Sequence, residues 1–277
     1  MTIRGTTALI AHLGYPTDSF KSPLIYNPYF EYAGIDAVVV PMGCRAEHFP
    51  SLLASLFSLT NIRGALITMP LKVVAAAQVD EASRAVRIAG SCNAIRRLDD
   101  GRLQGDLFDG EGFVRALTRK GCTIDGASAL VVGAGGVGSA ISGSLAAHGA
   151  HAITLFDIQP ESAQALSDRL ASYYPGLELK TGLNDPVGHD IVVNATPIGM
   201  RADDPMPLDV ERLTSNMWVS DVVMAQSMTP LVIAAQERGC HVQAGVDMLF
   251  EQIPAYLEFF GFPSTTPDHL RRLVDIR

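Results

Sequence analysis

Apolar residues in the middle of the chain alternate between short continuous runs and runs at helical spacing. Ser128–Val132 and Ala152–Phe156 are continuous, as expected of strands that are buried on both faces of a sheet. Between them, Ser139–His148 carries alanine, isoleucine and leucine at helical spacing. The later segments predict, in order, a helix at Glu161–Tyr173, strands at Asp190–Asn194 and Trp218–Val223, a helix at Pro230–Arg238 and a strand at Cys240–Gln243. This order is that of a doubly wound parallel sheet.

The first hundred residues repeat the alternation on their own. They predict strands at Ala8–His12, Ala37–Val40 and Gly64–Thr68, with helices at Pro23–Ala33 and Glu47–Leu59. A boundary is expected near Asp106–Gly112, where glycines and acids precede a helical stretch at Phe113–Lys120. The helical segment Met248–Phe260 is too short for a domain, so we expect it to pack onto one of the other two. The pattern predicts an α/β protein of two domains with a ligand cleft between them.

Composition and charge narrow the choice of partners. The 277-residue chain has a formal net charge of −8, which argues against a nucleic-acid partner because phosphate backbones require a basic surface. A secretory signal is not expected, and no apolar run is long enough to span a membrane. The four cysteines lie far apart, which excludes a zinc knuckle and predicts reduced thiols. We expect a cytoplasmic protein with no metal site and no membrane partner.

One glycine-rich segment has the sequence and the context of a dinucleotide site. It matches the pattern G-x-G-x-x-G with the residues Gly133, Ala134, Gly135, Gly136, Val137 and Gly138. The pattern alone is weak, but here it follows a predicted strand and opens a predicted helix, as the binding mechanism requires. Gly133 allows the tight turn, Gly135 lets a pyrophosphate approach the backbone, and Gly138 lets helix and strand pack closely. The alternative is a glycine-rich turn without a ligand.

Asp157 indicates NAD as the cofactor of this Rossmann-type domain. It ends the next predicted strand, about twenty residues after the last glycine, where an acid hydrogen-bonds the ribose hydroxyls. A carboxylate there would repel the 2′-phosphate of NADP, and no arginine or lysine follows in Ile158–Glu161 to bind that phosphate. NAD is therefore favoured, and the alternative is a surface acid at a strand end.

A lysine and a carboxylate are candidates for proton transfer. Lys72 lies just beyond a predicted strand end, and Asp109 lies at the proposed domain boundary. At the mouth of a dinucleotide cleft this pair suits hydride transfer between an alcohol and a ketone, because one group can shuttle the hydroxyl proton while the other holds the substrate. Spacing alone leaves the alternative that both are solvated surface groups.

Six segments carry motifs that occur in the same order in one enzyme family. They are Gly14–Pro23 for G-x-P-x-x-H-S-x-S-P, Leu66–Lys72 for N-V-T-x-P-x-K, Gly90–Ile95 for G-A-x-N-T-I, Leu107–Gly110 for N-T-D-G, Asn194–Met200 for a loop beside the nicotinamide, and Gly245–Gln252 for a segment whose last residue touches substrate. On these motifs the chain resembles the shikimate dehydrogenase family over nearly its full length.

The resemblance implies a role for each matching residue. Lys72 and Asp109 would be the catalytic pair, and the substrate contacts would be Ser22, Thr68, Asn93 and Gln252. The cofactor would be held by the glycine-rich loop, by Asp157 and by a loop that contains Asn194, Thr196 and Pro197. The resemblance also implies a substrate domain, 1–108 plus 248–277, around an inserted NAD-binding domain, 109–247. The expected partners are a small-molecule substrate and, as a homodimer, a second copy of the chain.

Four positions that are polar in the family are apolar here. Phe20 replaces the first serine of the S-x-S pair, Leu66 and Leu107 replace asparagines, and Met224 replaces a tyrosine. Burying a substrate hydroxyl or carboxylate against such a side chain costs about 1–3 kcal/mol per unpaired group. We therefore expect retained chemistry and an altered pocket: an NAD-dependent dehydrogenase of shikimate, quinate or a less polar relative, with shikimate a poor substrate.

Two other functions stay open on the sequence. A non-catalytic NAD-binding regulatory protein could report redox state to a partner, although it would have no need of Lys72 and Asp109. An NADP-dependent enzyme of aromatic amino acid biosynthesis is the other alternative, and both Asp157 and the altered pocket argue against it.

Overall fold

The computed structural model describes residues 2–18, 20–201, 203–224 and 228–274. The chain divides into two compact units, here called the first unit (Met1–Phe108 with Ile253–Arg277) and the second unit (Asp109–Gln252). Helix α9 (Gly245–Phe259) runs from the second unit into the first. We expected the return into the first unit at Met248, whereas it lies at Ile253.

The first turns of α9 stay with the second unit because they pack against α5 (Asp109–Arg119). A Cβ on Gly112 would lie 2.7 Å from the Gln252 Cβ and 2.8 Å from the Met248 carbonyl oxygen, so glycine is needed for this close approach. The Lys120 ammonium also pairs with the Asp247 carboxylate at 2.7 Å. These contacts bind the start of α9 to α5.

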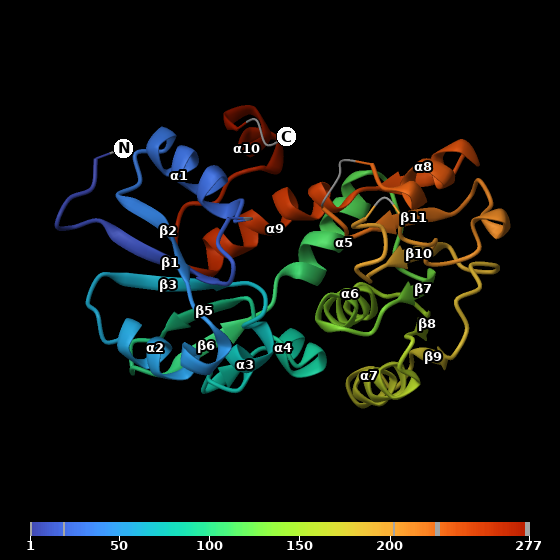
Figure 1. Ribbon diagram of the computed structural model, residues 1–277, viewed down its shortest axis with the longest axis horizontal. Helices are drawn as coiled ribbons and strands as arrows, with labels where there is room; N and C mark the ends of the chain where they lie inside the picture. The colour runs from blue at the N-terminus through green and yellow to red at the C-terminus, as the bar shows by residue number, and fades with distance from the viewer. Residues whose placement is uncertain (1, 19, 202, 225–227, 275–277) are drawn as a thin grey trace. The chain divides into compact units, whose positions relative to one another are not determined.

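The first unit contains a six-stranded mixed sheet (Figure 1). Its strands, in spatial order, are β2 (Ala37–Gly43), β1 (Ala8–Gly14), β3 (Ile62–Ile67), β5 (Ala94–Arg97), β6 (Leu103–Asp106) and β4 (Glu81–Ala82). β1 pairs in parallel with β2 and β3, as the predicted alternation of strands and helices requires. β5 is antiparallel to both β3 and β6. This antiparallel part was not predicted, because such short strands carry too little periodicity.

Helices lie on both sides of the first sheet. One side carries α1 (Ser22–Tyr32) and α10 (Pro267–Leu273), and the other carries α2 (Phe49–Leu56), α3 (Lys72–Ala76) and α4 (Arg84–Ala89) (Figure 1). A single 3-10 turn, η1 (Ala46–His48), precedes α2. The largest fully buried side chains of this unit include Tyr26, Phe30, Phe49 and Phe260.

The second unit contains a six-stranded sheet in which every neighbouring pair of strands is parallel. In spatial order the strands are β12 (His241–Gln243), β11 (Trp218–Asp221), β10 (Ile191–Asn194), β7 (Ser128–Val132), β8 (Ala152–Phe156) and β9 (Glu178–Thr181). This topology confirms the predicted doubly wound sheet. β7 and β8 begin and end at the predicted residues, whereas the exposed edge strand β9 was not predicted.

On one side of this sheet lie α6 (Gly136–Ala147) and α7 (Pro160–Tyr173), and on the other lies α8 (Pro230–Glu237) (Figure 1). A 3-10 turn, η2 (Val210–Arg212), precedes β11. Helix α5 begins at Asp109 and not at Phe113, where we had placed its start. The glycines that suggested a loop are needed inside the helix, because a Cβ on Gly110 would overlap the Ala140 carbonyl oxygen of α6.

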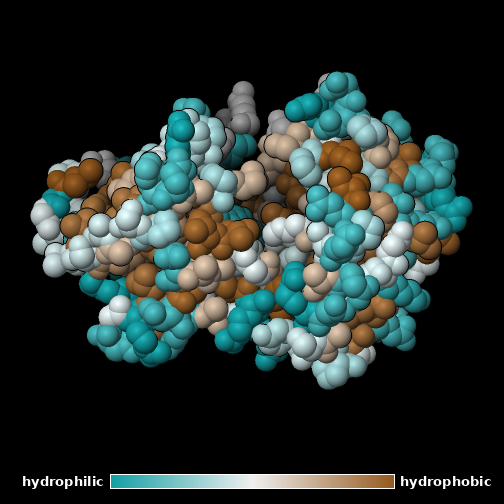
Figure 2. Space-filling view, turned by 60° about the horizontal axis from the view of Figure 1, so that its bottom comes forward, coloured by the Kyte–Doolittle hydropathy of each residue, from teal (hydrophilic) through white to brown (hydrophobic). Residues whose placement is uncertain are grey.

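The surface mixes hydrophilic and hydrophobic groups. On the face drawn in Figure 2, brown hydrophobic groups are separated by teal hydrophilic ones. Within the described ranges, no helix combines the length and the apolar character that crossing a membrane would require.

Candidate active site

The predicted site residues form two groups, one within each unit. The first unit carries Ser22, Thr68, Lys72 and Asn93, and the second carries Asp109, Gly133–Gly138, Asp157, Asn194, Thr196, Pro197 and Gln252.

In the first unit, the predicted residues follow or precede strands at one edge of the sheet. Thr68 comes directly after β3, Lys72 opens α3, and Asn93 directly precedes β5. Backbone hydrogen bonds join these segments: the Ile67 N–H donates to the Asn93 carbonyl and the Cys92 N–H donates to the Lys72 carbonyl, both at 2.8 Å. The structure therefore brings Thr68, Lys72 and Asn93 together.

The Asn93 side chain is fixed at one end and unpartnered at the other. It is buried, and its Oδ1 accepts a hydrogen bond from the Phe108 N–H at 3.0 Å. Its own backbone N–H donates to the Asp106 carbonyl at 3.0 Å. Nδ2 is buried and has no hydrogen-bond partner in the described part of the chain. A buried donor of this kind costs about 1–3 kcal/mol unless a partner satisfies it, which suits a ligand-binding amide.

Phe20, which stands where the family has a serine, lies against the ends of β1 and β3. A Cβ on Gly14 would lie 2.9 Å from the Phe20 Cζ and would overlap the Thr68 Cγ2, so both side chains occupy the space that this glycine leaves. The Phe20 ring also stacks on the His12 ring, with centroids 4.0 Å apart. Phe20 therefore lies beside Thr68 and does not turn away from it.

The other altered positions differ in their surroundings. Leu66 and Leu107 are buried in the first unit, whereas Met224 belongs to the second unit and is exposed. Ser22, the retained serine of the S-x-S pair, is the half-buried first residue of α1. Ser19, from the same motif, lies outside the described residues. In the first unit the departures thus place buried apolar side chains where the family has amides.

Sequence reasoning missed His12, which lies beside Leu66. The two residues are register partners in the neighbouring parallel strands β1 and β3. His12 is 6% exposed, and its Nδ1 has no hydrogen-bond partner among the described residues. Burial and, secondarily, the positive charge of Lys72 lower the pKa of His12 to about 4, so the ring is neutral near pH 7. The available signal was a lone polar residue in the otherwise apolar strand Ala8–Gly14.

In the second unit, the glycine-rich loop connects β7 to α6. Gly133 has a φ of +104°, a conformation that favours glycine, and a Cβ on Gly138 would overlap the Gly133 carbonyl oxygen. A Cβ on Gly135 would meet no described atom within 4 Å. Protein packing therefore accounts for Gly133 and Gly138, whereas the backbone at Gly135 is left open to the close approach of a ligand. The N–H groups at the start of α6 suit an anion.

The carboxylate of Asp157 turns back onto the glycine-rich loop. Oδ2 accepts a hydrogen bond from the Ala134 N–H at 2.7 Å, and Oδ1 accepts one from the Gln159 N–H at 2.9 Å. Each carboxylate oxygen can accept a further hydrogen bond, so this half-buried group can also bind hydroxyls. The next residue, Ile158, is uncharged and 85% exposed.

Asn194 organises the loop that follows β10. Its Oδ1 accepts from the Thr196 hydroxyl at 2.6 Å and from the Thr196 N–H at 3.1 Å. Its Nδ2 donates to the Ile198 carbonyl at 2.9 Å and to the Asp221 carboxylate at 3.1 Å. An amide offers two donors and two acceptor positions, so these bonds satisfy it. The buried Asn194 thus shapes the loop, in which Pro197 is exposed.

Asp109 and Gln252 lie on adjoining helices within the second unit. Asp109 is the buried first residue of α5, at the helix end whose dipole favours a carboxylate. Gln252, in α9, packs against Gly112, which is three residues after Asp109 and therefore on the same side of α5. Its Oε1 is buried and has no hydrogen-bond partner in the chain as described.

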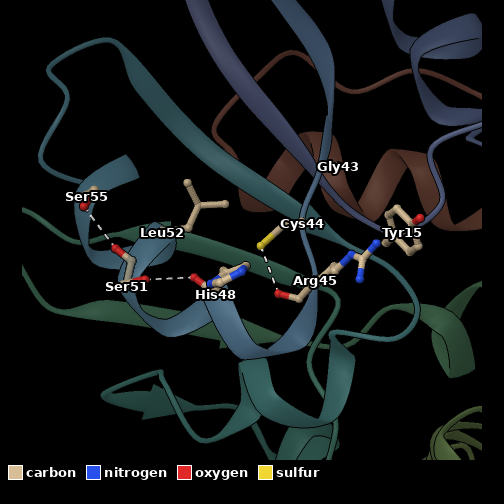
Figure 3. A pocket seen from close by; sticks show the side chains of 8 residues that line it. All are labelled: Tyr15, Gly43, Cys44, Arg45, His48, Ser51, Leu52 and Ser55. Atoms are coloured by element: carbon tan, nitrogen blue, oxygen red, sulfur yellow. Dashed lines mark hydrogen bonds between the residues drawn. The ribbon is translucent and has the colours of Figure 1, made fainter.

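A separate pocket of about 580 Å³ lies beyond the carboxyl end of β2 (Figure 3). Its lining includes Arg45 and Cys44, but none of the predicted substrate residues. The Ser51 hydroxyl donates to the His48 carbonyl at 3.0 Å, and the Ser55 hydroxyl donates to the Ser51 carbonyl at 3.0 Å. Burial raises the pKa of the Cys44 thiol. The thiol is therefore not activated, and the two serine hydroxyls are bonded to backbone carbonyls of η1 and α2.

Known proteins resemble the chain over its whole length. A family model described as the shikimate dehydrogenase substrate binding domain matches residues 13–95. The shikimate dehydrogenase (NADP(+)) of Acidiphilium cryptum is 33% identical over 276 residues, which are 99% of this chain and 98% of that protein. The structure of shikimate 5-dehydrogenase from Listeria monocytogenes, in complex with shikimate and NAD, matches with a TM-score of 0.92 and 26% identity, covering 99% of this chain and 98% of that one.

A third comparison concerns a related activity. The structure of quinate dehydrogenase from Corynebacterium glutamicum, in complex with NAD, matches with a TM-score of 0.85 and 28% identity, covering 96% of this chain and 98% of that one. These likenesses agree with the family that the six motifs predicted. The chain therefore belongs to the shikimate dehydrogenase family of oxidoreductases.

Proposed function

We propose that the chain is an NAD-preferring dehydrogenase that oxidises a ring hydroxyl of a cyclic carboxylic acid of the shikimate and quinate class, and that it uses shikimate itself poorly. The observation that carries this proposal is the Asn93 amide, whose buried Nδ2 has no partner among the described residues and which is grouped with Thr68 and Lys72. A fixed donor beside a lysine suits a hydroxylated ligand. The activities named for the Listeria and Corynebacterium enzymes support the same substrate class.

The second unit offers residues that fit a dinucleotide. Gly135 and the N-terminus of α6 would hold the pyrophosphate, because neither a side chain nor a described neighbour crowds that backbone. Asp157 would accept hydrogen bonds from the ribose hydroxyls while Ala134 keeps its carboxylate in place. When bound, the nicotinamide supplies the hydride acceptor.

NAD is the proposed form of this cofactor. The Acidiphilium relative is named for NADP(+), whereas the Listeria and Corynebacterium structures contain NAD. In this chain the Asp157 carboxylate would repel a 2′-phosphate, and the exposed Ile158 offers it no positive charge. These two residues support a preference for NAD.

Lys72 and Asp109 are the residues proposed to act on the proton of the substrate hydroxyl. In its uncharged form the Lys72 amine would hydrogen-bond the reacting oxygen and take up its proton to become an ammonium, and the Asp109 carboxylate would stabilise the positive charge that this produces. Ser22, Thr68, Asn93 and Gln252 would orient the substrate through hydroxyl and amide groups. This role explains why a lysine and a buried carboxylate are retained while other polar positions are not.

The poor use of shikimate is proposed from the buried apolar positions. Phe20 lies beside Thr68, and Leu66 and Leu107 are buried in the same unit. Each hydroxyl or carboxylate oxygen that loses its partner there costs about 1–3 kcal/mol. Two such losses lower affinity about a hundredfold, at tenfold per 1.4 kcal/mol.

Alanine variants test the catalytic pair. Lys72→Ala or Asp109→Ala should lower kcat by about two to four orders of magnitude, the usual contribution of an acid–base group. The dissociation constant of NAD should stay nearly unchanged, because neither residue belongs to the glycine-rich loop. Lys180→Ala, at an exposed position of β9, is the matched control and should leave both quantities unchanged. Near-complete turnover in either catalytic variant would contradict the assignment.

A further inference from the structure

One buried polar side chain of the first unit, His12, is not among the residues assigned to the proposed site. His12 lies in β1 with its side chain on the same face of the sheet as its register partner Leu66. Thr68, two residues after Leu66, lies on that face as well. Both Thr68 and Phe20 approach Gly14. Strand β1, the segment before α1, and the end of β3 thus place His12 among the substrate residues.

The His12 imidazole is suited to hydrogen-bond a hydroxyl group. Burial and the charge of Lys72 hold the pKa of His12 at about 4, so near pH 7 one ring nitrogen donates a hydrogen bond and the other accepts one. A hydroxyl both donates and accepts, whereas a carboxylate only accepts. The Phe20 ring, stacked at a centroid distance of 4.0 Å, restricts the rotation of the imidazole.

We propose that His12 contacts the substrate and determines specificity: its imidazole hydrogen-bonds a ring hydroxyl and takes over the polar role that the amide at position 66 has in the family. The inference rests on the proposed function. Position 66 is leucine here and asparagine in the family, and His12 is the register partner of Leu66, so this face of the sheet carries a polar side chain on the neighbouring strand. The substrate therefore carries a hydroxyl directed at β1.

A purely structural histidine would behave differently. Buried structural histidines are hydrogen-bonded to the protein, and most buried polar atoms have a partner. The Nδ1 of His12 has no such partner among the residues that the structure describes. Leucine at this position would remove an unsatisfied polar atom and keep most of the volume, so the free protein should lose no stability.

The test combines three variants with shikimate, quinate and analogues of both from which single ring hydroxyls have been removed. His12→Leu removes both ring nitrogens, and His12→Asn restores a donor and an acceptor. His48→Leu makes the same change at an exposed histidine of the same unit and is the matched control. Steady-state kinetics with NAD give kcat and KM, and thermal unfolding of each free protein gives its midpoint.

We expect His12→Leu to lower kcat/KM about 10- to 100-fold for the best substrate, mainly through KM. The loss should disappear for one deoxy analogue, whose missing hydroxyl identifies the group that His12 binds. His12→Asn should recover part of the loss, His48→Leu should resemble the unmodified protein, and the unfolding midpoint of His12→Leu should not fall.

Two results would overturn the inference while leaving the proposed function in place. One is unchanged kinetics of His12→Leu on every compound that the unmodified protein oxidises. The other is an equal loss on all compounds together with a lower unfolding midpoint, which is the behaviour of a structural residue. If the unmodified protein oxidises none of the compounds, the proposed function itself fails, and the inference fails with it.

Discussion

At the scale of single residues, some of the buried polar atoms without partners belong to residues of the predicted or proposed site. Among the described residues these include His12 Nδ1, Asn93 Nδ2 and Gln252 Oε1. The motifs predicted roles for Asn93 and Gln252, because both match family positions. They could not predict His12, because its position has no match in a motif, and its importance depends on the pairing of β1 with β3.

The depressed pKa of His12 makes folding stability depend on pH. Its pKa is about 4 in the folded protein against 6.5 for the free side chain, so between these values the unfolded chain binds the additional proton. Stability is therefore retained above pH 6.5 and falls as the pH falls toward 4, by up to about 3 kcal/mol for this group.

We expect His12→Leu to lose this part of the pH dependence. Unfolding midpoints of the two proteins, measured between pH 4 and pH 8, should diverge below pH 6.5, with the unmodified protein the more sensitive. Parallel curves over the whole range would show that His12 is not buried in a neutral form.

Cofactor choice should depend on Asp157 and its neighbour. The unmodified protein should bind NAD at least about tenfold more tightly than NADP, because the carboxylate repels the 2′-phosphate. The double variant Asp157→Ser with Ile158→Arg should narrow or invert this ratio in titrations with both cofactors. Equal affinities of the unmodified protein for NAD and NADP would be incompatible with the assignment.

At the scale of elements, the glycines of the glycine-rich loop should differ in role, some being needed for packing and one for ligand binding. Gly135→Ala should change stability by less than about 1 kcal/mol, since no described atom lies within 4 Å of the new Cβ, and should lower NAD affinity about tenfold or more. Gly138→Ala should destabilise the fold by about 1–3 kcal/mol, because its Cβ overlaps the Gly133 carbonyl oxygen.

Gly176→Ala is the control for this pair, because its Cβ would also meet no neighbour within 4 Å and it lies outside the loop. Unfolding midpoints and NAD titrations of the three variants give both quantities. Unchanged NAD affinity in Gly135→Ala would mean that no ligand approaches this backbone closely.

How well the bounds of an element could be predicted depended on how regular its pattern of apolar residues is. β7 and β8 are continuous apolar runs, and their limits could be predicted to the residue. The start of α5 could not, because Gly110 suggests a loop until its close contact with α6 is known. Strands β5 and β6 escaped prediction because four residues carry little pattern, and because β5 joins the sheet through its antiparallel pairing with β3, and β6 through its antiparallel pairing with β5.

At the scale of the whole molecule, the proposed function divides between the two units. The second unit keeps the features of a dinucleotide-binding domain, including its strand order and Asp157. The first unit keeps Lys72 and Asn93, but it has Phe20 beside Thr68 and a buried leucine at position 66. Both units fit an enzyme that keeps the chemistry of the family but has an altered substrate pocket.

The kinetic constants for shikimate, compared with those for quinate and the deoxy analogues with NAD as cofactor, test this account most directly. It predicts turnover of at least one compound of the class, with kcat/KM for shikimate well below that of the best compound. A sub-millimolar KM for shikimate with an ordinary turnover of about 1–1000 per second would contradict it, because Phe20, Leu66 and Leu107 would then not shape the pocket.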